Sequence, residues 1–335
     1  MKRSTDPSVT TAERYRAFAE VEARGMSDCY EEWAAGVARD DAVLALIDRL
    51  PAPKRQPNLV FSAARYLGAP VTGYTEFARW LLDQWDDVAA VCLSHATQTN
   101  EPGRCATLLP ALAAIPGPLA LIEVGASAGL CLYPDRYSYR YRLPGGQDDR
   151  TLDPDAGPSP VVLDCELTGN VPVPGRMPEV VWRAGVDLNP LDAGRAEDVA
   201  WLDALIWPEH HDRRARLHAA VEVVKDDPVE LVRGDLVAEI EALVGRAPVG
   251  ASVVVFHTAV LAYLDDSARK DFVDIMDRLP VSWLANEGTG VVPGVLDRVK
   301  AGNAQPTATS DFVLSLDGEP IAFTQPHGRA LHWLG

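Results

Sequence analysis

Apolar residues recur at three- and four-residue spacing over the first third of the chain, and this pattern predicts helices. Glycine and proline separate the apolar stretches and mark where the helices end. No convincing strand pattern occurs before residue 119. The predicted helices cover residues 11–24, 28–38, 40–50, 57–67, 74–99 and 104–115.

From residue 119 onward, short apolar runs alternate with helical stretches. Such alternation is typical of a parallel, doubly wound sheet. A strand meander with an Asp317-Gly318 turn ends the chain and indicates an antiparallel addition to the sheet. Core strands are predicted at residues 119–124, 180–187, 229–235, 251–257 and 281–285, helices at 195–207, 209–225, 236–244 and 268–278, and the meander at 311–316, 321–324 and 330–334.

A tyrosine-rich insertion of residues about 134–178 separates the first two core strands. Residues 137–143 alternate like a strand before a Pro-Gly-Gly turn, and residues 161–167 could pair with them. The tyrosines, Tyr139 among them, either line a substrate pocket or form one face of a half-buried hairpin. We therefore expect a helical region over residues 1–117 and an α/β domain over residues 118–335 that carries this hairpin.

Charge and composition narrow the function. The chain has 335 residues, a net charge of −17 and a pI of about 4.8, and it lacks a basic patch, which disfavours a nucleic-acid partner. Its five cysteines show no C-x-x-C spacing, which fits reduced thiols and neither a disulfide framework nor a metal site. We find no signal peptide and no membrane-spanning run. We expect a cytoplasmic protein that acts on a small molecule or a peptide.

Polar residues end all five predicted core strands. In an open parallel sheet the ligand lies beyond the carboxyl ends of the strands, so these residues mark the candidate site. They are Glu123, Asp187, Asp235, His257 and Glu287.

The first strand leads into the stretch Glu123-Val-Gly125-Ala-Ser127-Ala-Gly129. Its glycines allow backbone and ligand to approach closely. Ser127 can cap a following helix, whose N-terminus would attract a carboxylate or a phosphate. The sequence therefore predicts a strand, a tight turn and an anion-binding helix start.

This stretch resembles the first motif of class I S-adenosylmethionine-dependent methyltransferases, E-x-G-x-G-x-G, with Ser127 at the middle glycine. The resemblance implies a Rossmann-like, mostly parallel sheet that binds S-adenosylmethionine. It also implies that Asp187 holds the ribose hydroxyls and Asp235 contacts the adenine, with Leu188 and Leu236 beside them.

A narrower resemblance covers nearly the whole chain. The stretches that carry it are Gly125-Ala-Ser-Ala-Gly-Leu, Asp187-Leu-Asn-Pro-Leu-Asp, Trp201 to Trp207-Pro208, Val255 to Tyr263 and Asn286-Glu287-Gly288. Together they resemble DUF2332, an uncharacterised family of actinobacteria and relatives. That resemblance implies a fold but no established reaction.

Candidates for catalysis follow from the later strand ends. The fourth strand ends in Phe256-His257-Thr258-Ala259 and lacks the Asn/Asp-Pro-Pro-aromatic loop of many amino-methylating enzymes. His257 is then the obvious general base for methyl transfer. Glu287 is either an acid/base or the cap of a turn.

The polar stretch before residue 105 has two interpretations. It is either a capped helix start or a loop that offers substrate-binding side chains to a cleft. The side chains concerned are Asn100, Glu101 and Arg104.

Two other functions use the same residues. A non-catalytic adenosyl-ligand binder or sensor would share the fold without a catalytic loop. A serine esterase would use Ser127 in G-x-S-x-G, with Asp235 and then His257 or His327 in the required chain order. The helical region before residue 119 disfavours the esterase, because the strand–turn–helix segment that carries the serine nucleophile of such enzymes should follow several strands. An NAD site would need glycine at positions 127 and 130.

Overall fold

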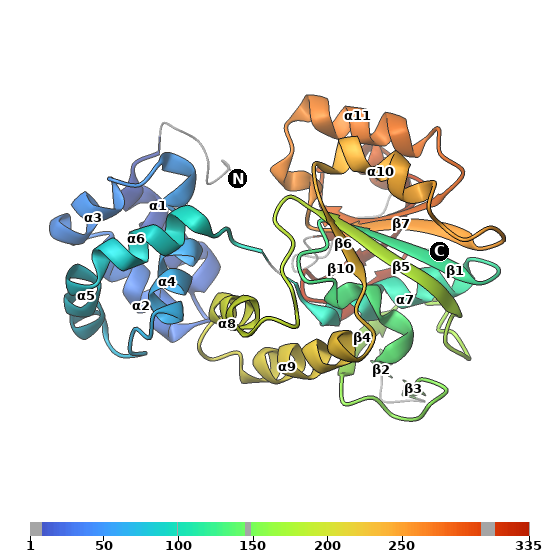
Figure 1. Ribbon diagram of the computed structural model, residues 1–335, viewed down its shortest axis with the longest axis horizontal. Helices are drawn as coiled ribbons and strands as arrows, with labels where there is room; N and C mark the ends of the chain where they lie inside the picture. The colour runs from blue at the N-terminus through green and yellow to red at the C-terminus, as the bar shows by residue number, and fades with distance from the viewer. Residues whose placement is uncertain (1–8, 99, 145–148, 303–311, 335) are drawn as a thin grey trace. The chain divides into compact units, whose positions relative to one another are not determined.

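The computed structural model describes residues 9–98, 100–144, 149–302 and 312–334 (Figure 1). The chain forms two compact units. One contains Met1–Thr99 and Arg195–Ala215, and the other contains Asn100–Gly194 and Arg216–Gly335. The stretch 100–117 thus belongs to the same unit as the sheet, and residues 195–215 belong to the helical unit.

The first unit is helical, as the spacing of apolar residues predicts. Its aromatic side chains form a core in which Trp33 stacks on Phe77 at a ring distance of 3.7 Å. The predicted helix over 74–99 is two helices that meet at Gln84 and end at Ser94. The helices are α1 (Thr11–Ala17), the π-helical η1 (Phe18–Ala23), α2 (Asp28–Val37), α3 (Asp41–Ile47), α4 (Pro57–Tyr66), α5 (Tyr74–Asp83), α6 (Trp85–Ser94) and α8 (Ala196–Leu205).

The second unit is built on one mixed sheet of eleven strands, in the order β3-β2-β4-β11-β10-β9-β8-β7-β1-β5-β6. A large, mostly parallel α/β sheet is therefore confirmed. The strands are β1 (Leu119–Val124), β2 (Ser138–Arg142), β3 (Arg150–Leu152), β4 (Val162–Thr168), β5 (Val180–Asp187), β6 (Glu230–Arg233), β7 (Ser252–Thr258), β8 (Ser282–Gly288), β9 (Phe312–Leu316), β10 (Glu319–Thr324) and β11 (Ala330–Trp333).

The five core strands are parallel neighbours in the order β6-β5-β1-β7-β8. All six residues of β1 are buried, because this strand lies in the middle with helices on both faces. Helices α10 (Leu236–Val244) and α11 (Asp266–Met276) cover one face, and α7 (Cys105–Ala114) lies on the other (Figure 1). The chain reverses direction along the sheet between β1 and β7, which is where such sheets bind ligands.

The tyrosine-rich insertion extends the sheet. Strand β2 pairs with β3 in an antiparallel hairpin and with β4 in a parallel register, and β4 in turn pairs with β11. Residues 137–143 and 161–167 do pair, but as parallel strands and not as a hairpin. The side chains of Tyr137, Tyr139 and Tyr141 are fully buried.

The remaining helices of this unit are α9 (His211–Asp226), whose residues from Arg216 onward belong to it, and α12 (Val295–Ala301). The meander joins the core through β9, which is antiparallel to β8. Within the part of the chain that the structure describes, no helix is both long and apolar enough to cross a membrane.

Candidate functional site

The turn after β1 lies at the centre of the edge of the sheet where the carboxyl ends of the parallel strands meet, called the carboxyl edge from here on. Gly125, Ser127 and Gly129 all have left-handed backbone angles, with φ of +69°, +52° and +73°. The chain then forms two short 3₁₀ turns, η4 (Leu130–Leu132) and η5 (Pro134–Arg136), before β2. The predicted helix after Ser127, and with it the anion-binding helix start, is therefore wrong.

Side chains from distant segments hold this turn in place. Asp187 accepts hydrogen bonds from the backbone N–H of Ser127 through Oδ2 and of Asn189 through Oδ1, both at 2.8 Å. Asn100 Oδ1 accepts from the Leu130 N–H at 2.9 Å. These anchors stand in for the helical hydrogen bonds that the local sequence predicts. Asp187 thus links β5 directly to the turn.

The glycine at position 125 is required by packing. A Cβ on Gly125 would lie 2.5 Å from Cγ2 of Val260, which follows β7. The predicted close approach at Gly125 is therefore made by a protein side chain. Gly129 has more room, because its nearest neighbour, Val229 Cγ2, is 3.3 Å from an added Cβ.

Two buried polar atoms at this turn lack a partner. Glu123 Oε2 and Ser127 Oγ make no hydrogen bond in the described structure, although their residues are only 2% and 3% exposed. Burial raises the pKa of Glu123 well above its ordinary value, the Cys131 thiol and the Asp187 carboxylate raise it further, and the Arg104 guanidinium opposes them. Burial at this position therefore favours the neutral form of the Glu123 carboxyl group.

Ser127 does not match the nucleophile of a hydrolase. Its hydroxyl has no hydrogen-bond partner in the described structure, so no histidine activates it there. The turn also lacks the helix that follows a nucleophile elbow.

His257 is fully buried, and both ring nitrogens are used. Nε2 accepts a hydrogen bond from the indole N–H of Trp283 at 2.9 Å, and Nδ1 lies 2.7 Å from Glu287 Oε1. Because an indole can only donate, the proton of the neutral imidazole is assigned to Nδ1. This arrangement corrects the expectation that His257 is a general base, since no ring lone pair faces a ligand.

Glu287 caps a turn, which is one of its two predicted roles. Its Oε1 also accepts from the backbone N–H groups of Val260 and Leu261, at 2.7 and 3.0 Å. These residues begin the 3₁₀ turn η7 (Leu261–Tyr263) after β7. Glu287 therefore joins β8 to the end of the neighbouring strand, and its geometry does not favour acid/base chemistry.

The polar residues before α7 brace the same edge. Glu101, 2% exposed, forms an ion pair with Arg216 at 2.8 Å and caps the 3₁₀ turn η3 (Pro102–Arg104). Arg104, 5% exposed, donates to the carbonyl oxygens of Pro326 and Thr258 at 2.9 and 3.0 Å. These contacts support the capped-start interpretation, and neither side chain is presented to solvent.

Tyr139 is a core residue. It stacks on Tyr141, and its hydroxyl donates to the Pro134 carbonyl at 2.5 Å. This arrangement corrects the pocket-lining interpretation and agrees with the packing alternative.

Accessible side chains gather at the ends of β5 and β6. Leu188 is 69% exposed, and Asp235 is exposed while its Oδ1 caps α10 through the N–H groups of Val237 and Ala238. Leu236, in contrast, is buried. Of the predicted cofactor residues, Asp187, Leu188 and Asp235 therefore lie together on neighbouring strand ends and reach the surface.

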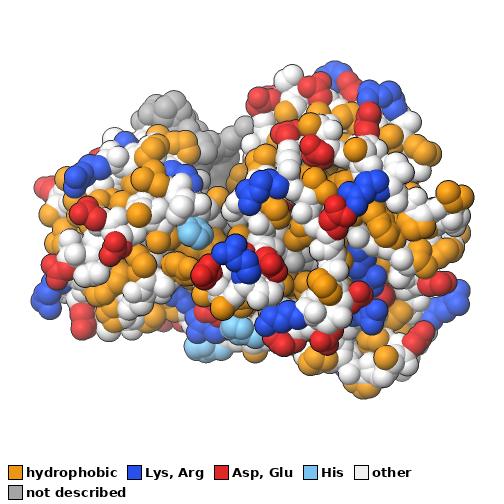
Figure 2. Space-filling view, in the orientation of Figure 1, with side chains coloured by type: hydrophobic (Ala, Val, Ile, Leu, Met, Phe, Trp, Pro, Cys, Tyr) orange, Lys and Arg blue, Asp and Glu red, His pale blue; other side chains and the backbone are white. Residues whose placement is uncertain are grey.

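Sequence reasoning missed Val260, Trp283 and Arg216. Val260 and Trp283 read as ordinary apolar core positions, and Arg216 lies in a charged helix with no local signal. Figure 2 shows acidic and basic side chains interspersed on the visible face, without a continuous basic surface. Among the described residues, no group of three or more His, Cys, Asp or Glu side chains could hold a metal ion.

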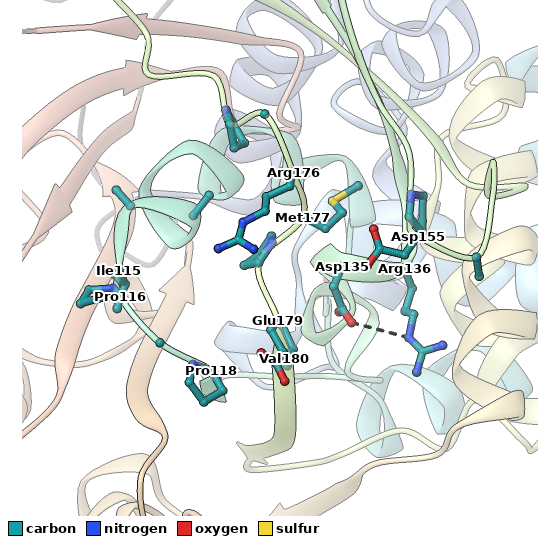
Figure 3. A pocket seen from close by; sticks show the side chains of 18 residues that line it. Ile115, Pro116, Pro118, Asp135, Arg136, Asp155, Arg176, Met177, Glu179 and Val180 are labelled. Atoms are coloured by element: carbon teal, nitrogen blue, oxygen red, sulfur yellow. Dashed lines mark ion pairs between the residues drawn. The ribbon is translucent and has the colours of Figure 1, made fainter.

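A hollow of about 920 Å³ lies at the opposite edge of the sheet, near the amino ends of β1 and β5 (Figure 3). Its walls include Pro118, which precedes β1, and Val180, which begins β5. No residue predicted for catalysis, cofactor or substrate lines it. Because ligands of parallel sheets bind at the carboxyl ends, this hollow is distinct from the candidate site.

One protein family matches the chain. The model of the family described as "Uncharacterized protein conserved in bacteria (DUF2332)" matches residues 12–333. Neither the curated proteins nor the solved structures contain a match to the chain.

Proposed function

The chain belongs to the DUF2332 family, and we propose that it binds S-adenosylmethionine at the carboxyl ends of β5 and β6 and transfers its methyl group to a small molecule or a peptide. The observation that carries the proposal is the juxtaposition of Asp187, Leu188 and Asp235 beside the turn after β1. Two carboxylates and an exposed apolar side chain are suited to a ribose, an adenine amino group and an adenine face.

The order of the parallel strands supports a Rossmann-like, methyltransferase-type interpretation. Numbered among themselves along the chain, the core strands lie in the order 3-2-1-4-5, which is the order of doubly wound nucleotide-binding sheets. An antiparallel strand, β9, follows the fifth. The candidate acids end the second and third of these strands, on the side of the switch point where such sheets bind nucleosides.

Asp187 and Asp235 would hold the adenosine portion. Asp187 would accept the ribose hydroxyls, because a carboxylate oxygen can accept more than one hydrogen bond and the N–H groups of Ser127 and Asn189 already hold this carboxylate in a fixed orientation. Asp235 uses Oδ1 to cap α10, and its exposed carboxylate is suited to the adenine amino group. The side chain of Leu188 would cover the ring.

Glu123 and Ser127 would meet the amino-acid portion. Each has a buried polar atom without a partner, and leaving such an atom unsatisfied costs about 1–3 kcal/mol. A ligand ammonium or carboxylate that reached these atoms would remove that cost. The chemistry fits, although the glycine turn itself is filled by Val260.

The residues of the site would bind and orient, because His257 offers no free lone pair. When bound, the cofactor supplies an electrophilic methyl group on a sulfonium. The protein would hold it next to an acceptor that is already nucleophilic, such as a carboxylate or a thiolate, and proximity would supply the rate enhancement.

A non-catalytic adenosyl-ligand binder is the second candidate. Both ring nitrogens of His257 form hydrogen bonds within the protein, so the ends of strands β7 and β8 contribute no catalytic group, which favours this candidate. This candidate predicts affinity for the cofactor without methyl transfer to any acceptor. Release of S-adenosylhomocysteine in the presence of a cell extract distinguishes the two.

The test is a calorimetric titration of the purified chain with S-adenosylmethionine and with S-adenosylhomocysteine. Asp187→Ala should abolish saturable binding, because it removes the ribose acceptor and releases the turn. Asp235→Asn should weaken binding about tenfold, since asparagine keeps the helix cap but changes the acceptor.

Asp40→Asn is the matched control. Asp40 caps α3 through the same pattern, with Oδ1 accepting from the N–H groups of Ala42 and Val43. It lies in the other unit and should leave the affinity unchanged. Absence of binding to the unmodified chain, or unchanged binding in both Asp187→Ala and Asp235→Asn, refutes the proposal.

A further inference from the structure

The hollow lies at the amino ends of β1 and β5, and the length of a strand separates it from the proposed cofactor site at the carboxyl ends. Strand β1 has six residues, and a strand rises about 3.3 Å per residue, so roughly 20 Å lie between the two edges. A ligand in this hollow could not contact Asp187 or Asp235. Its volume, about 920 Å³, is that of a small-molecule pocket.

The walls of the hollow are stiff. Proline fixes the backbone φ angle, so a proline-lined wall needs little ordering when a ligand binds. Asp135, on the same wall, is held by two 2.6 Å hydrogen bonds from Arg183, whose guanidinium lies 5.1 Å from the Tyr133 ring centre. The lining prolines are Pro116, Pro118, Pro154, Pro174 and Pro178.

Solvent-exposed charges of both signs lie on the wall of the hollow and have no protein partner among the described residues. Within the described residues, Arg176, Asp155 and Glu179 make no side-chain hydrogen bond or ion pair. Arg136, by contrast, pairs with Asp135 at 3.6 Å. Figure 3 shows the Arg176 guanidinium and the Asp155 carboxylate apart from each other on the wall of the hollow.

We propose that this hollow binds a zwitterionic amino acid or dipeptide. Its carboxylate would pair with Arg176 and its ammonium group with Asp155 or Glu179, while Ile115 and Met177 supply apolar surface for its side chain. A purely anionic ligand would meet two carboxylates, and a purely cationic one would meet Arg176. Because the hollow lies at the opposite edge of the sheet from the proposed methyl-donor site, its ligand would not be the methyl acceptor.

The test is a calorimetric titration of the full chain with the dipeptide Ala-Leu, its N-acetylated form and its C-terminal amide. Only the free dipeptide carries both charges, so each blocked form should bind at least about tenfold more weakly. Arg176→Gln should weaken the free dipeptide by a similar factor. Arg278→Gln is the control, because Arg278 is exposed, pairs with Glu241 and does not line the hollow.

Asp187→Ala separates this proposal from the cofactor proposal. It should leave dipeptide binding unchanged, whatever it does to S-adenosylmethionine. Three results overturn the proposal: no heat change at millimolar dipeptide, equal affinity for the blocked forms, or loss of dipeptide binding in Asp187→Ala. Thermal unfolding of Arg176→Gln and of Asp187→Ala verifies that both variants are folded.

Discussion

Gly125→Ala tests why the turn after β1 needs glycine. Residue 125 has a φ of +69°, where an L side chain costs about 1–2 kcal/mol. An added Cβ would also lie 2.5 Å from Val260 Cγ2, and such overpacking costs about 1–3 kcal/mol. We therefore expect the free energy of unfolding to fall by about 2–5 kcal/mol, a large share of the ~5–15 kcal/mol of a typical domain.

Two companion variants divide this loss. Gly250→Ala has a φ of +90° with nothing within 4 Å of the new Cβ, so it measures backbone strain alone. Val260→Ala removes the clashing methyl groups, and in the double variant the steric part of the loss should disappear. The coupling between positions 125 and 260 should then be about 1–3 kcal/mol.

Urea unfolding followed by tryptophan fluorescence measures the unmodified chain and all four variants, and a titration with S-adenosylmethionine accompanies each. If the two substitutions at 125 and 260 are additive within about 0.5 kcal/mol, the packing explanation is wrong. If Gly125→Ala keeps full stability but loses the cofactor, the glycine serves close approach of a ligand, as its sequence motif predicts.

The buried polar groups near β1 give three further expected outcomes. Burial raises the pKa of Glu123, so the folded state keeps a proton that the unfolded state loses above about pH 4.5. The free energy of unfolding should therefore fall as the pH rises from about 4.5 to the raised pKa of the folded state, and urea titrations at several pH values should show that Glu123→Gln removes this decline. His257→Gln should lower the free energy of unfolding by about 2–4 kcal/mol without changing cofactor affinity, because it disturbs the hydrogen bonds to Trp283 and Glu287. If the variant is instead stable and binds the cofactor but transfers no methyl group, His257 is the general base. Ser127→Gly should raise the unfolding free energy by about 1 kcal/mol, since φ is +52°; a decrease would show that the serine side chain supports the turn.

The fold was largely predictable because its strands are strongly marked. Strand β1 is apolar at five of its six positions and buried on both faces, and such runs between helical stretches leave few alternatives. The pairing of the tyrosine-rich insertion with the strands at the end of the chain was not predictable. The pairing of β4 with β11 brings together segments more than a hundred residues apart, and no local signal specifies that register.

The turn after β1 shows where local signals mislead. Small residues and a potential Ser127 cap favour a helix, yet Asp187 and Asn100 supply tertiary acceptors that hold an irregular turn. His257 is a similar case. Its partners Glu287 and Trp283 come from the next strand, so the sequence shows a histidine at a strand end but not that its nitrogens are occupied.

The two halves of the carboxyl edge differ in how far their side chains are exposed to solvent. The ends of β7 and β8 are closed, since His257 and Glu287 are at most 1% exposed and hold each other and the turn η7. The ends of β5 and β6 present Leu188 and Asp235 to solvent. A ligand that entered from the open side would meet Asp187, and through its bond to the Ser127 N–H it would act on the central turn. On the closed side, Val260 packs against Gly125 and leaves no room for a side chain there, so the turn is held by protein contacts from both sides.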